Sequence, residues 1–160
     1  MKPLSENAIR LLGEAGQSGD GPGRLHRAWT GGELDNDDLP ALISQVWTHT
    51  DNAEQTIGTV AWLAMFRAAG PIVVPTTRSL PSEPLLVYRG TAESRKGGMA
   101  WTWDIERARW FRCRCEHFGE VAGVYRTSIT PAAVLAMFDT RGEREFVVDP
   151  SLLGVIERIE

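Results

Sequence analysis

The chain has 160 residues, of which 42% are hydrophobic and 24% are charged, and its formal net charge is −4 at pH 7. A chain of this length can bury most of its apolar surface in one core, so we expect a single domain over residues 1–160. This net negative charge excludes a nucleic-acid binder that relies on an overall excess of basic residues. A protein acceptor or protein partner is therefore expected rather than nucleic acid.

The sequence carries no targeting or membrane signal. Its start, MKPLSENAIRLLGEAG, lacks a long apolar core and a cleavage pattern, and no apolar run approaches the roughly 18 residues of a membrane span. Cys113 and Cys115 lie two positions apart on an expected helix, where their side chains point apart and cannot form a disulfide. These features predict a soluble cytoplasmic protein with reduced thiols and no membrane contact.

The first 70 residues carry helical signals. A short helix is expected around residues 5–13, and the glycine-rich stretch GQSGDGPG that follows is interpreted as a loop. In DDLPALISQVWTHT, Asp38 is the expected N-cap and Pro40 lies in the first turn of an amphipathic helix. The segment DNAEQTIGTVAWLAMFRAAG predicts another helix, which ends at Gly70. Residues 1–70 are thus expected to form a helical subregion.

Strand signals dominate the second half. Residues 71–84 read as an extended connector with prolines at its turns. The runs LLVYR, GEVAGVYRTSI and EREFVVD predict strands, PAAVLAMF predicts a short helical turn, and DIERARWFRCRCEHF predicts a helix capped by Asp104. That helix is expected to carry one apolar stripe, formed by Ile105, Ala108, Phe111, Cys115 and Phe118. The expected fold class is α+β, with the helical subregion followed by a mostly antiparallel sheet and one packed helix over residues 85–160.

Common catalytic and metal motifs are absent from the sequence. None of the three histidines stands in a nucleophile context, and there is no G-x-S-x-G motif. Cys113, Cys115 and His117 follow one another at i, i+2 and i+4, so they cannot all face one ion from a helix. No metal site is expected.

A spread-out set of polar and aromatic residues remains on the expected sheet. Arg89 ends the run VYR, and Glu143 and Glu145 lie in RGEREFVVDP. Aromatic rings and a hydroxyl accompany them, supplied by Tyr88, Trp101, Thr102 and Trp103.

In this order, these residues resemble the Arg-Ser-Glu branch of the ADP-ribosyltransferase superfamily, over residues 85 to about 150. In that branch an arginine on the first core strand binds NAD, a Ser-Thr-Ser motif forms part of the nicotinamide pocket, and a Glu-x-Glu motif supplies the catalytic acid. Arg89 takes the arginine place, residues 100–102 take the Ser-Thr-Ser place, and Glu143 and Glu145 take the Glu-x-Glu place. The resemblance therefore implies catalysis by Glu145 and Glu143, because a carboxylate near the ribose stabilises the positive charge that develops when the nicotinamide–ribose bond breaks. It implies NAD binding by Arg89, Tyr88, Gly90, Trp101, Thr102 and Trp103. A fork-shaped guanidinium suits the pyrophosphate or ribose, and a flat nicotinamide ring needs aromatic walls and a hydroxyl.

The resemblance implies a mono-ADP-ribosyltransferase, a glycosyltransferase that consumes NAD and uses no metal, or an NAD glycohydrolase with water as acceptor. In the resembling family, an acidic residue two positions before the catalytic glutamate accompanies arginine modification, so Glu143 favours an arginine acceptor. Alanine stands at position 100, where the family has its first serine. This keeps open a third hypothesis, a catalytically silent domain of the same fold that binds a protein partner. For either enzyme, we expect Arg89 and Glu145 to converge on one cleft.

Overall fold

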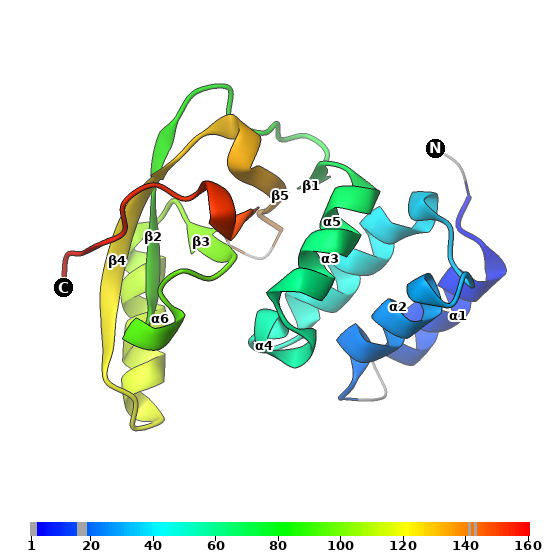
Figure 1. Ribbon diagram of the computed structural model, residues 1–160, viewed down its shortest axis with the longest axis horizontal. Coiled ribbons are helices and arrows are strands. Elements are labelled where there is room, and N and C mark those ends of the chain that lie inside the picture. Colours follow the sequence, from blue (N-terminus) through cyan, green and yellow to red (C-terminus); the bar gives the residue numbers. More distant parts are fainter. Residues whose placement is uncertain (1–2, 16–18, 141, 143) are drawn as a thin grey trace. The chain divides into compact units, whose positions relative to one another are not determined.

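The computed structural model describes residues 3–15, 19–140, 142 and 144–160. The chain divides into two compact units, Met1–Ile72 and Val73–Glu160. The first unit is helical, and the strands of the second belong to a seven-stranded sheet (Figure 1). The fold class is therefore α+β with the helices at the N-terminus, which confirms the expectation from the sequence.

Aromatic rings form the centre of the helical unit. Its described α-helices are α1 (Glu6–Ala15), α2 (Gly21–Thr30), α3 (Leu39–His49), α4 (Ala53–Ile57) and α5 (Thr59–Ala69). Trp47 of α3 packs edge-on against Trp62 and Phe66 of α5, with ring centroids 4.9 and 5.3 Å away. The indole N–H of Trp62 donates to the Ala53 carbonyl at 2.7 Å, which satisfies a polar group buried in this cluster.

The helices of this unit differ from expectation at three points. The helix α2 begins inside the glycine-rich stretch interpreted as a loop, with Pro22 in its first turn. The expected helix over residues 51–70 is divided at Gly58, whose φ of +83° interrupts the helical backbone between α4 and α5. The Asp38 side chain does not cap α3; its carboxylate accepts hydrogen bonds from the Ser5 backbone N–H and hydroxyl at 3.0 and 2.7 Å.

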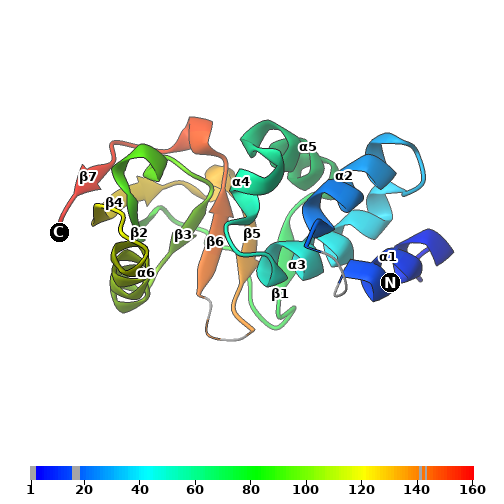
Figure 2. The same cartoon turned by 90° about the horizontal axis from the view of Figure 1, so that it is seen from below.

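The sheet has the order β1-β5-β6-β3-β2-β4-β7 (Figure 2). Its strands are β1 (Ile72–Val74), β2 (Leu85–Ala92), β3 (Ala100–Thr102), β4 (Ala122–Ile129), β5 (Val134–Phe138), β6 (Glu145–Val148) and β7 (Glu157–Arg158). All pairings whose register is defined, from β5 across to β7, are antiparallel. The segment PAAVLAMF, expected to be a helical turn, forms a 3-10 turn only at Pro131–Ala133 and then becomes β5.

The helix α6 (Ile105–His117) lies along one face of the sheet, over β2 and β4 (Figures 1 and 2). Asp104 caps it as expected, because its carboxylate accepts a hydrogen bond from the Glu106 N–H at 3.0 Å. Within the expected apolar stripe, Ala108 is fully buried, whereas Phe118 is 69% exposed and does not belong to the packed face. Ile105, Phe111 and Cys115 are half-buried.

Candidate functional site

Three of the residues expected at the site lie in one row across neighbouring strands. Tyr88 on β2 is directly opposite Thr102 on β3, and Thr102 is directly opposite Glu145 on β6. Directly opposed residues of antiparallel strands present their side chains on the same face with Cβ atoms roughly 4.5–5.5 Å apart. A carboxylate, a hydroxyl and a phenol ring are therefore neighbours on one side of the sheet.

Arg89 lies on the opposite face of the sheet from this row. Side chains alternate along a strand, so the neighbour of Tyr88 points to the other side, which Arg89 shares with its cross-strand partner Tyr125. Its guanidinium donates to two backbone carbonyls, those of Arg95 at 3.1 Å and of Ala100. Arg89 thus ties the connection between β2 and β3 to the sheet. The strand register places Arg89 and Glu145 on opposite faces of the sheet. The expectation that they converge on one cleft is therefore wrong.

Gly90 has a packing role. A Cβ at this position would overlap the carbonyl oxygen of Ala108 and lie 2.6 Å from the backbone nitrogen of Arg112. Gly90 therefore permits the close approach of α6 to β2. It also shows that α6 covers the same face as Tyr88, because residues two apart on a strand point the same way.

The two tryptophans of the expected nicotinamide pocket pack on the face of Arg89. Trp101 is 1% exposed, belongs to the hydrophobic core of the sheet, and donates its indole N–H to the Gly98 carbonyl at 2.8 Å. Trp103 is half-buried, and its ring centroid lies 4.8 Å from that of Phe146. Both rings are thus occupied by core contacts and are separated by the sheet from Glu145.

Glu145 is the first residue of β6 and is preceded by an unusual backbone conformation. Arg144 has a φ of +49°, in the left-handed region that residues other than glycine rarely adopt. Its guanidinium forms an ion pair with the carboxylate of Asp104, the N-cap of α6. The start of β6 is therefore fixed to the start of α6, and Glu145 follows that fixed point directly. Glu143 lies outside the residues that the structure describes.

Asp104 thus both caps α6 and pairs with Arg144, and both interactions affect its pKa. Partial burial by itself would raise the pKa of the Asp104 carboxyl, but hydrogen bonds from the Glu106 N–H and from Arg144 outweigh it and hold the pKa below its ordinary value. The N-cap role of Asp104 could be predicted from the sequence. The ion pair could not, because Arg144 is distant in the chain and only strand pairing brings it close.

Thr102 contributes a nearly buried hydroxyl to the row. The residue is 5% exposed, and its Oγ accepts a hydrogen bond from the Asp104 N–H at 3.1 Å. A threonine hydroxyl that accepts one bond still has its own proton to donate, and the opposed Glu145 is an acceptor. The arrangement is suited to orienting a carboxylate.

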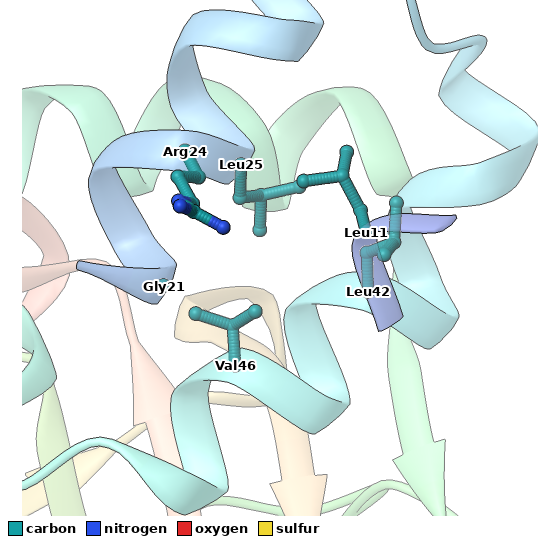
Figure 3. Close-up of a pocket in the computed structure, with 6 residues that line it drawn as sticks. All are labelled: Leu11, Gly21, Arg24, Leu25, Leu42 and Val46. Atoms are coloured by element: carbon teal, nitrogen blue, oxygen red, sulfur yellow. The ribbon is translucent and has the colours of Figure 1, made fainter. Parts of the chain in front are cut away.

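Among the residues that the structure describes, no three His, Cys, Asp or Glu side chains gather in a way that could hold a metal ion. No helix among these residues is both long and apolar enough to cross a membrane. An apolar depression with one arginine lies in the helical unit, and none of the residues predicted to act lines it (Figure 3). It is lined by Leu11, Gly21, Arg24, Leu25, Leu42 and Val46.

Comparisons of the chain with protein-family models, with curated proteins and with solved structures found no match.

Proposed function

We propose that the chain is an NAD-dependent mono-ADP-ribosyltransferase or NAD glycohydrolase that uses Glu145 as its catalytic carboxylate. The observation that carries the proposal is the row of Tyr88, Thr102 and Glu145 across β2, β3 and β6. The row brings together a negative charge, a hydroxyl and an aromatic ring on one sheet face. These are the groups that a nicotinamide riboside requires.

The chemistry assigned to the row is cleavage of one glycosidic bond. The bond between nicotinamide and C1 of the ribose breaks, and its electron pair leaves with neutral nicotinamide. The positive charge left on the ribose is stabilised by the Glu145 carboxylate. A nucleophile of the acceptor then forms a bond to C1 and loses its proton. In transfer the acceptor is a protein side chain, and in hydrolysis it is water.

Within this proposal, Thr102 is a positioning residue for Glu145 and Tyr88 is a wall for the nicotinamide ring. Cys113 and Cys115 are free thiols, which is typical of a reducing compartment, and we place the activity in the cytoplasm on that ground.

Incubation with labelled NAD and a cell lysate tests the proposal, with free nicotinamide and labelled macromolecules measured together. A transferase releases nicotinamide and labels protein, whereas a glycohydrolase releases nicotinamide without labelling. Release that equals a buffer control in both the presence and the absence of lysate would contradict both activities.

A second candidate is a catalytically silent domain that binds a protein partner. The observation in its favour is that the Arg89 guanidinium is engaged by two backbone carbonyls on the face opposite Glu145, while Ala100 removes one hydroxyl from the family pattern. Thermal unfolding separates the candidates, because NAD must raise the melting temperature of a protein that binds it only when folded. No shift at saturating NAD favours the silent domain.

A further inference from the structure

Two residues other than glycine have a positive φ in the part of the chain that the structure describes, Asn52 at +50° and Arg144 at +49°. Asparagine tolerates this left-handed conformation, because its short polar side chain can form local hydrogen bonds. An arginine has no such advantage, so the backbone of Arg144 is strained. A strained conformation persists only where surrounding contacts hold it in place.

The contact that Arg144 makes with Asp104 lies just beyond the end of a strand ladder. The strands β3 and β6 pair in antiparallel order, and Thr102 opposite Glu145 is the last pair of their ladder. Asp104 lies two residues after Thr102, and Arg144 lies one residue before Glu145. The ion pair between Arg144 and Asp104 therefore joins the two chain segments at the point where their backbone pairing ends.

Asp104 is itself fixed to both the sheet and the helix α6. Its backbone N–H donates to the Oγ of Thr102 at 3.1 Å, and its carboxylate accepts a hydrogen bond from the Glu106 N–H at 3.0 Å. Thr102 is 5% exposed, so this anchor lies at the edge of the packed interior. Asp104 thus contacts Thr102 on one strand and Arg144 on the other, and Glu145 lies beside both.

The net contribution of this ion pair to folding stability is expected to be small. The Arg144 side chain is 53% exposed and the Asp104 side chain is 23% exposed. Ion pairs in contact with solvent add little free energy to folding, and the left-handed backbone of Arg144 costs free energy. Because these two effects oppose each other, the main consequence of the pair is the position in which it holds the start of β6.

We infer that Arg144 and Asp104 are positioning residues for the Glu145 carboxylate. The inference rests on the proposed function, in which Glu145 stabilises the positive charge on the ribose. The last pair of a strand ladder frays readily, and fraying would move the carboxylate away from the ribose. A displacement of about 1 Å can lower a reaction rate by about 10²-fold. The ion pair keeps the last pair closed, so Glu145 stays aligned with Thr102.

Arg144→Gly in the full chain separates positioning from stability, because glycine adopts the left-handed conformation freely but cannot form the ion pair. Nicotinamide release at saturating NAD should fall by about tenfold or more, while KM and the melting temperature stay close to those of the parent chain. Asp104→Asn keeps a capping side chain but removes the charge, so it should lower turnover in the same way. Combining both substitutions should lower turnover no further, because each breaks the same interaction.

Two further variants serve as controls. Arg144→Lys keeps a positive charge within reach of Asp104 and should retain more turnover than Arg144→Gly. Asn52→Gly is the matched control, because it also introduces glycine at a residue with positive φ, but in the helical unit. Asn52→Gly should release nicotinamide at the rate of the parent chain.

The inference alone is overturned if the parent chain releases nicotinamide, Glu145→Gln does not, and either Arg144→Gly or Asp104→Asn releases it at the parent rate. It is also overturned if turnover falls together with a melting temperature well below that of Asn52→Gly, because the loss would then be one of structure. No release by the parent chain above a buffer control, or equal release by Glu145→Gln, overturns the proposed function and this inference with it.

Discussion

At the scale of single residues, Gly90 shows how a position with an expected ligand role can be required for packing. Gly90→Ala places a Cβ against the carbonyl of Ala108 and the backbone of Arg112, where no flexible side chain can move aside. The helix α6 must shift, so unfolding free energy should fall by about 2 kcal/mol or more. Urea unfolding, monitored by circular dichroism, measures this loss of unfolding free energy.

Gly97→Ala is the matched control for this prediction. A Cβ at position 97 would meet only the tip of Ile156, at 4.0 Å. Its unfolding free energy should stay within about 0.5 kcal/mol of the parent value. Equal effects of the two substitutions would show that α6 does not approach β2 as closely as the structure has it.

Arg89 offers a second test at this scale. Arg89→Lys keeps the charge but replaces a fork that reaches two carbonyls by a single ammonium. We expect a loss of about 1–3 kcal/mol of stability, measured by urea unfolding, while the rise in melting temperature caused by NAD is retained. If stability is unchanged and the NAD-induced rise disappears, Arg89 binds the dinucleotide as the family resemblance implies.

At the scale of elements, the helices with apolar periodicity and a capping residue were predictable. The helix α6 follows the Asp104 cap, and α3 has Pro40 in its first turn. The helix α2 was missed because its glycines are poor helix formers, yet a Cβ on Gly21 would already contact Val46 of α3, so packing overrides propensity. The strand β5 was missed because Ala136 and Met137 favour helices when read alone, whereas pairing with β6 decides their conformation.

The candidate site was predictable in part for a related reason. Residue types in chain order pointed to Tyr88, Thr102 and Glu145, which strand pairing places in one row. Which face each side chain occupies depends on register, because a shift by one residue exchanges the faces. Sequence order alone therefore could not separate Arg89 and Trp101 from Glu145.

The contact of α6 with Glu160 predicts a pH dependence. The hydrogen bond from Arg109 lowers the pKa of the Glu160 carboxyl below its ordinary 4.5, partial burial opposes this, and the charges of Arg109 and Arg112 lower it further. A lowered pKa in the folded state means that the stabilisation is complete above the ordinary value and is lost as pH falls through the lowered one.

Glu160→Gln removes the titrating group and tests this dependence. The parent chain should have the higher melting temperature near neutral pH, and the difference should shrink as pH falls below about 4.5. Melting curves of both chains across this range provide the measurement. A difference that stays constant with pH would mean that the Glu160 charge does not hold α6.

At the scale of the whole molecule, the division into two units predicts that the sheet unit has a core of its own. Residues 73–160 contain α6 and a cluster of buried residues on one sheet face that includes Val87, Trp101 and Tyr125. Expressed alone, this fragment should unfold cooperatively on heating. A broad, featureless transition would show that its folding depends on the helical unit.

The proposed activity depends on Glu145 as its catalytic carboxylate. Glu145→Gln preserves shape and hydrogen-bonding ability but removes the charge, so turnover should fall by about 10²-fold or more while NAD binding changes little. Glu157→Gln is the matched control, because Glu157 is also a strand glutamate of this sheet and is paired with Arg126 at its edge.

Nicotinamide release from NAD, measured for the parent chain and both variants at saturating NAD, tests this claim most directly. We expect release by the parent chain and by Glu157→Gln, and a loss of about 10²-fold or more in Glu145→Gln. Equal release by all three proteins, or no release above the buffer control by the parent chain, would contradict it.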